Sequence, residues 1–147
     1  MTTILERPDY NIKIYDDEKL FEVNIINDKE YVEDGFQEFL DYFKNTWELL
    51  RNTEDAYFLL INIHTNTSNN DLPLGAFIKL IQVLIELHNT FKTNLHSGAI
   101  LSKGVKKWQD AYNLMTKLYK HPDQREFIFS ESKDEITKFF KLNQLIK

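Results

Sequence analysis

The chain contains no cysteine, and only four of its 147 residues are glycine. Without thiols it can form neither disulfides nor a catalytic thiolate, and this fits a reducing compartment, so we expect the protein in the cytosol. The few glycines build no phosphate-cradling loop and no dinucleotide fingerprint, and no Gly-x-Ser-x-Gly sequence marks a nucleophile elbow. The sequence therefore gives little support to catalysis.

Positive charge is also in short supply. The 18 Lys and Arg residues are outnumbered by 23 Asp and Glu residues, and the net charge is −5, whereas a nucleic-acid binder needs a basic face. The apolar runs are too short and interrupted to span a bilayer, and the first residues lack a signal-peptide pattern. No histidine has metal-ligand spacing. We therefore expect no nucleic-acid partner, no membrane insertion, no metal and no cofactor.

The apolar content predicts one folded domain. A hydrophobic fraction of 42% in 147 residues suffices for a single core, with residues 1–10 as a flexible start. Alternating apolar and polar residues predict strands over 11–15 and 20–26, joined by an acidic turn. An amphipathic helix is expected over 32–51. The apolar run at 56–63 is rich in aromatic and branched residues, which predicts a central strand buried on both faces.

The second half of the chain alternates between helix and strand. Asp71 and Pro73 suit a helix start, and Ser132 with Glu135 forms a capping-box pattern before the last helix. The order β-β-α-β-α-β-α-β-α predicts an α/β fold with a mostly parallel central sheet and helices packed on it. The expected elements are a helix over 73–91, a strand over 97–102, a helix from 104 to 121, a strand over 125–130 and a helix after 132.

This element order, with a hairpin first and an amphipathic helix last, resembles the STAS domain, the family named after sulfate transporters and anti-sigma factor antagonists. Three stretches carry the resemblance: residues 57–63 with their polar loop and Asp71, residues 99–105, and residues 127–132 before the final helix. The resemblance implies a STAS-like sandwich without enzymatic activity. It also implies a protein partner, because members bind kinases, regulatory proteins or the cytosolic face of a transporter.

In the anti-sigma antagonists, a serine in an Asp-Ser-Ser/Thr-Gly motif at the start of the second helix is phosphorylated. Asp71 matches the aspartate, but Leu72, Pro73 and Leu74 follow it, so the phosphoacceptor is missing at this site. A phosphate near a helix N-terminus would still change docking through its nearly two negative charges. Ordinary polar loop residues are the alternative. The candidate phosphorylation sites are three residues of the preceding loop, Thr65, Thr67 and Ser68.

We expect the partner to bind the loop after the central strand and the start of the following helix, because functional loops converge at the carboxyl ends of strands in open α/β sheets. Leu80 belongs to a second apolar stripe on that helix, for which burial is the alternative and a homodimer contact a third reading. The expected contact residues are His64, Thr65, Asn66, Thr67, Ser68, Asp71, Leu72, Pro73, Leu74 and Leu80.

Three other functions stay open. The many Phe and Leu residues fit a carrier of lipids or other small ligands, and the stripe that contains Leu80 and Leu87 fits a self-associating structural protein. His64 with Asp71 fits a small enzyme, although a strand-end histidine more often has a hydrogen-bonding role. The remaining polar candidates are three histidines, explained as a partly buried side chain and turn residues, and six cations around the third helix. The cations fit docking of a phosphate or an acidic partner, with solvated helix charge as the commoner explanation. These candidates are His88, His96, His121, Lys103, Lys106, Lys107, Lys117, Lys120 and Arg125.

Overall fold

The computed structural model describes residues 2–7, 10–26, 33–50, 56–64, 74–91, 95–103, 105–118 and 127–145. They form one six-stranded sheet, in which the strands lie in their order along the chain, and four helices. The strands are β1 (Thr2–Glu6), β2 (Tyr10–Tyr15), β3 (Leu20–Ile26), β4 (Tyr57–His64), β5 (Leu95–Ser102) and β6 (Phe127–Ser130). The helices are α1 (Glu33–Leu50), α2 (Leu74–Phe91), α3 (Val105–Leu118) and α4 (Lys133–Leu145).

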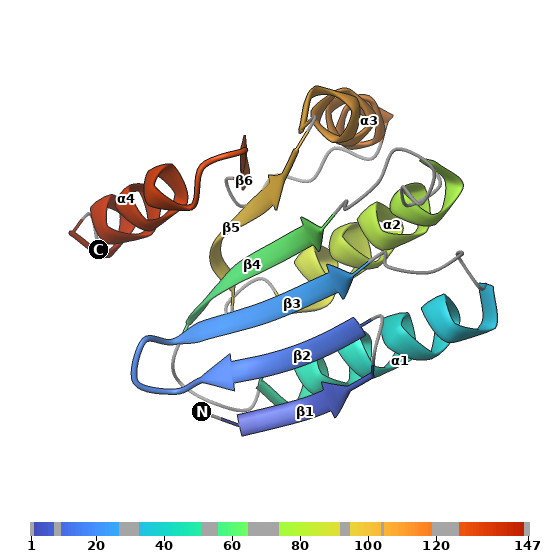
Figure 1. Cartoon of the computed structure of the whole chain (residues 1–147), viewed down its shortest axis with the longest axis horizontal. Helices are drawn as coiled ribbons and strands as arrows, with labels where there is room; N and C mark the ends of the chain where they lie inside the picture. Colours follow the sequence, from blue (N-terminus) through green and yellow to red (C-terminus); the bar gives the residue numbers. More distant parts are fainter. Residues whose placement is uncertain are drawn as a thin grey trace.

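The sheet is mixed and mostly parallel, which confirms the predicted α/β class. The two pairings from β1 to β3 are antiparallel, and the three pairings from β3 to β6 are parallel. From β3 to β6, each connection runs through one helix to the neighbouring strand, and all three connections advance in the same direction across the sheet. Because such crossovers share one hand, the three connecting helices lie on the same face of the sheet. Figure 1 shows α1 and α2 behind the strands.

The main core fills the space between the sheet and these three helices, and we call this side the covered face. Alternate residues of β3 and β4 point into it, among them Phe21 and Ile61, whose side chains are fully buried. The apolar stripe predicted for residues 32–51 is the buried side of α1. Its aromatic side chains are Phe36, Phe39, Phe43 and Trp47.

Helix α4 lies on the opposite side of the sheet, the open face. It covers a small apolar cluster formed by Leu60, Ala99 and Ile136. The Phe140 ring of α4 packs against Phe58 of β4, with 4.8 Å between the ring centroids. The main contacts of α4 with the sheet are made to β5 and β6, so this helix lies towards one end of the open face.

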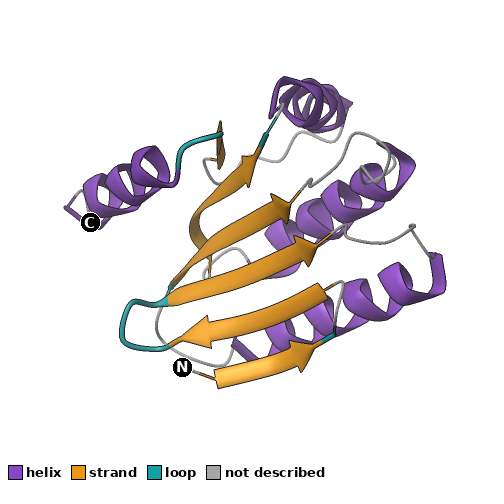
Figure 2. Cartoon of the chain, in the orientation of Figure 1, coloured by secondary structure: helices purple, strands orange, loops and turns teal. Residues whose placement is uncertain are grey.

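Two predicted local structures are present, with one difference in detail. Residues 16–19 form the β2–β3 turn, and Lys19 adopts the left-handed conformation (φ 54°) that glycine would take in a tighter turn. At the start of α4, the Ser132 hydroxyl accepts a hydrogen bond from the Glu135 N–H (3.3 Å). The Glu135 carboxylate does not return to Ser132 but accepts from the Ser130 hydroxyl (2.7 Å). Figure 2 shows both short connections.

Two expectations are wrong. The segment expected to be a flexible start contains β1, which pairs with β2 and adds one strand to the predicted order. Its two threonines and single leucine gave too short an alternation to recognise. Leu80, expected to contact a partner, is 0% exposed and belongs to the covered-face core. The burial alternative holds, because α1 and α3 flank α2 on both sides.

Candidate functional site

A cavity of about 360 Å³ lies at the sheet edge where β4 and β5 end. Figure 1 shows the arrowheads of β3, β4 and β5 at this common edge. The cavity combines side chains from β4, β5, the β6–α4 turn and the start of α4, so four segments distant in sequence converge on it. We call it the carboxyl-edge cavity. Its lining residues are Asn62, Ile63, His64, Leu101, Ser102, Lys103, Glu131 and Lys133.

The orientation of His64 is set by hydrogen bonds on the open face. The Asn24 amide nitrogen donates to the Asn11 Oδ1 (2.7 Å) and to the Glu22 Oε1 (3.0 Å). An ionised carboxylate only accepts, so the Asn24 Oδ1 is the atom that faces His64 Nε2 at 3.2 Å. His64 Nε2 therefore carries the proton and donates. Its other nitrogen remains an acceptor while the ring is neutral.

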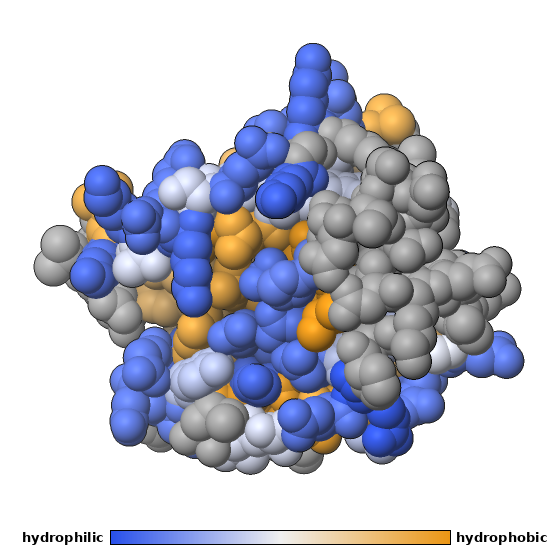
Figure 3. Space-filling model, in the orientation of Figure 1, coloured by the Kyte–Doolittle hydropathy of each residue, from blue (hydrophilic) through white to orange (hydrophobic). Residues whose placement is uncertain are grey.

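The same hydrogen bonds belong to a polar row across three strands. Asn11 lies opposite Asn24 in the β2–β3 register, and Asn24 lies opposite Asn62 in the β3–β4 register. Asn24 is only 6% exposed although it lies on the open face. Figure 3 shows hydrophilic residues across the middle of this face, with apolar residues beside them. Nearby, burial and then the charge of Glu22 raise the pKa of Tyr15.

Two serines fix the ends of β5 and β6 on the opposite side of the cavity through hydrogen bonds. Ser102 is buried and accepts a hydrogen bond from the Trp108 Nε1–H (3.1 Å), which ties the end of β5 to α3. The Ser130 hydroxyl accepts from the Ser132 N–H (3.0 Å) and so closes the turn that presents Glu131. Serine hydroxyls here position backbone and helices. The Ser130 hydroxyl also donates to the Glu135 carboxylate (2.7 Å), which ties the end of β6 to α4.

The charges of the cavity lie at its rim. Lys103 directly follows β5, Glu131 belongs to the β6–α4 turn, and Lys133 begins α4; all three side chains are exposed. His64 and Asn62 are half-buried further along β4. The rim thus presents two ammonium groups and one carboxylate, all of which can contact a ligand from solvent.

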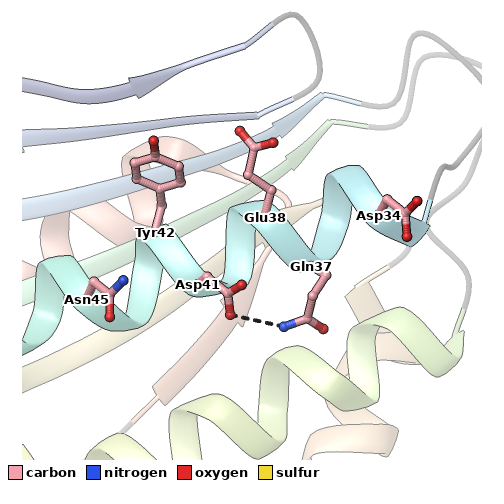
Figure 4. Close-up of a pocket in the computed structure, with 6 residues that line it drawn as sticks. All are labelled: Asp34, Gln37, Glu38, Asp41, Tyr42 and Asn45. Carbon is pink, nitrogen blue, oxygen red and sulfur yellow. Dashed lines mark hydrogen bonds between the residues drawn. The ribbon is translucent and has the colours of Figure 1, made fainter.

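A second hollow, of about 400 Å³, lies along the exposed side of α1 (Figure 4). All its described lining residues come from that one helix, and two of its carboxylates are engaged by neighbours. Asp41 accepts from Gln37 (3.1 Å), and Glu38 pairs with Arg7 (3.1 Å). Within the described ranges, no three His, Asp or Glu side chains gather into a group that could hold a metal ion. We interpret this surface as a solvated helix face.

The described residues include only part of the predicted contact set. His64 lines the carboxyl-edge cavity, and Leu80 is in the core. Leu74 begins α2, but its side chain lies outside the described residues. The predicted phosphorylation sites and the proposed His64–Asp71 pair also cannot be placed. The loop residues outside the described ranges are Thr65, Asn66, Thr67, Ser68, Asp71, Leu72 and Pro73, and the side chains of Leu87, His88, His96, Lys107, Lys120, His121 and Arg125 are likewise outside.

Several cavity and network residues were not predicted. Lys103 was a candidate for docking a phosphate or an acidic partner, with solvated helix charge as the preferred explanation, and it lies at the cavity rim. The alternation of β3 does place Glu22 and Asn24 on the face opposite Phe21 and Val23, which was a usable signal for the polar row. Nothing in the sequence pattern brings Glu131 and Lys133 to the end of β4, because that contact depends on which face α4 packs on.

Within the part of the chain that the structure describes, no helix is both long enough and apolar enough to cross a membrane. A scan against protein-family models, a search of curated proteins and a search of solved structures each found no match.

Proposed function

We propose that this chain is a non-catalytic regulatory domain of the STAS type, which works in the cytosol by binding a protein partner at the carboxyl-edge cavity and the loop that follows His64. The cavity carries the proposal, because ligands of open α/β sheets bind at the carboxyl ends of parallel strands. The successive βα steps from β3 onward, with a helix last, support the STAS-type reading, although β1 adds one strand before the expected hairpin.

The chemistry of the cavity favours binding over turnover. The donor nitrogen of His64 is engaged by Asn24, and the buried hydroxyl of Ser102 accepts from Trp108. The charged groups stand at the rim, where they suit contact with another molecule's surface. Leu101 adds an apolar wall beside them, which matches the mixture of apolar and polar groups in protein interfaces.

Site-specific photo-crosslinking tests this proposal. A photoreactive amino acid replaces Leu101 or Glu131, two lining residues that carry no positive charge, in the full chain, which is expressed in cells of its own source and irradiated. The matched controls carry it at Lys106 of α3 or Lys138 of α4, which are exposed lysines outside the cavity lining. We expect one discrete crosslinked protein from the cavity positions and none from the controls. Equal crosslinking from all four positions, or none from any, would contradict a partner site at the cavity.

A further inference from the structure

We infer that the partner places a carboxylate in the carboxyl-edge cavity, so that the partner's contact segment is acidic. This inference rests on the proposed function and specifies its chemistry. Lys103 and Lys133 stand on different elements, at the end of β5 and the start of α4, yet line one cavity. An anion between them would gain two charge-assisted hydrogen bonds.

The charge count selects a carboxylate over a phosphate. Glu131 lines the same cavity, so the described residues of the rim contribute two positive charges and one negative charge. One carboxylate leaves this cluster neutral. A phosphate, with nearly two negative charges, would leave it net negative beside Glu131. The Nε2–H of His64 donates a hydrogen bond to the Asn24 Oδ1 and is therefore engaged within the protein.

The start of α4 is not the source of the attraction. Asp134 and Glu135 occupy its first turn and oppose a further anion there, and the Glu135 N–H is already capped by Ser132. The two lysines therefore carry the recognition, with the Asn62 amide as an uncharged polar group of the lining. Leu101, which is half-buried, provides apolar contact for the methylene groups of an acidic side chain.

The test is an NMR titration of the full chain with N-acetylated, C-amidated tetraglutamate, and with tetraglutamine as the uncharged match. We expect saturable shifts of the Lys103, Glu131 and Lys133 amide signals with tetraglutamate only. The double variant Lys103→Glu/Lys133→Glu should bind about tenfold more weakly, since each exposed pair contributes up to about 1 kcal/mol. The control Lys106→Glu/Lys138→Glu should bind as the unchanged chain does.

The Glu131→Gln substitution should strengthen tetraglutamate binding, in contrast to the lysine substitutions. It removes a like charge, so we expect tetraglutamate to bind about two- to fivefold more tightly. Thermal unfolding of each variant verifies that these exposed substitutions leave the fold intact. The inference is overturned if tetraglutamine binds equally well, if the double variant binds unchanged, or if inorganic phosphate binds more tightly than tetraglutamate.

The two proposals fail in different ways. Crosslinks from positions 101 and 131 in a cell lysate that excess tetraglutamate does not reduce would support the partner site and overturn the carboxylate. Saturable tetraglutamate binding without any crosslinked protein would overturn the protein partner and leave the carboxylate site standing. The site would then serve a free ligand. Crosslinks that tetraglutamate reduces would support both.

Discussion

The two faces of the sheet are built from the same strands and have different chemistry. On the covered face, β3 and β4 contribute Phe21, Val23 and Ile61 to a core packed with aromatic rings from α1. On the open face, the next residues along β3 are Glu22 and Asn24, which form hydrogen bonds. Alternation along a strand thus separates a stabilising surface from a surface that can bind.

The open face is itself divided. Near β5 and β6, α4 covers a small apolar cluster around Leu60 and Ala99. Towards β2 and β3, amide and carboxylate groups replace apolar side chains. The carboxyl-edge cavity lies where these halves meet, with His64 from the polar half and Lys133 from α4. The covered face should therefore dominate stability, while the open face contributes less and holds the site.

The largest expected effect compares one phenylalanine from each face. Phe39 is fully buried and stacks on Tyr10 with 5.0 Å between ring centroids. Phe39→Ala should lower the free energy of unfolding by about 3–5 kcal/mol, through lost burial and the cavity left behind. Phe140 of α4 is half-buried, so Phe140→Ala should cost about 2 kcal/mol or less. Urea unfolding measures both.

Equal losses of stability in Phe39→Ala and Phe140→Ala would contradict the claim that the covered face dominates stability. That outcome would mean that α4 and its cluster unfold as one cooperative unit with the main core. A smaller loss for Phe140→Ala with an unchanged denaturant slope would support the division into a main core and a satellite cluster.

An intermediate effect is expected from the polar row. Asn24 donates hydrogen bonds to Asn11 and Glu22, and its side chain is almost fully buried, with 6% exposure. Asn24→Ala should cost about 1–2 kcal/mol. Asn24→Asp keeps the size but places a second carboxylate beside Glu22, so it should cost more than the alanine variant at neutral pH.

The matched control for the polar row is Asn11→Ala, which removes a half-buried residue and one hydrogen bond. It should cost less than Asn24→Ala. The ¹⁵N chemical shifts of His64 supply a second readout, because loss of the Asn24 acceptor should release the preference for the Nε2-protonated ring. An unchanged tautomer in Asn24→Ala would show that another group orients His64.

The sequence predicted the fold well because the covered face has strong periodic signals. The apolar spacing in residues 32–51 produced α1 as Glu33–Leu50, and the run at 56–63 produced β4 as Tyr57–His64. β1 was missed because its burial comes from pairing at the sheet edge beside α1, and not from a pattern of its own. Leu80 was misjudged because a helix with two apolar sides can be sandwiched or exposed, and only its neighbours decide.

The site was less predictable, for a physical reason. His64 was found because it ends a recognisable central strand. Its partner Asn24 is 40 residues away, and Lys133 reaches the cavity only because α4 packs on the open face. Polar residues carry no periodic signal that pairs them across elements, so their convergence follows from tertiary structure alone.

The smallest expected effect lies on the wet side of the covering helices, where Lys44 of α1 donates to Glu86 of α2 at 2.6 Å. This hydrogen bond raises the pKa of Lys44 above its ordinary value of 10.5. The native-state pKa exceeds the unfolded one, so the contribution is fully present below about pH 10 and is lost as pH rises through the raised pKa. The Lys44 and Glu86 side chains are 39% and 54% exposed, so solvent screens the pair.

Glu86→Gln should therefore lower the free energy of unfolding by less than about 1 kcal/mol at neutral pH. Urea unfolding of the unchanged chain and the variant should show a constant difference up to pH 9, which narrows above pH 10.5, the ordinary pKa of Lys44, and in about 1 M salt. A salt-independent difference as large as that of Phe140→Ala would mean that the contact between α1 and α2 depends on this pair and not on the apolar packing beneath it. In that case, part of the stability that we attribute to the buried core would come from the solvent-exposed sides of α1 and α2.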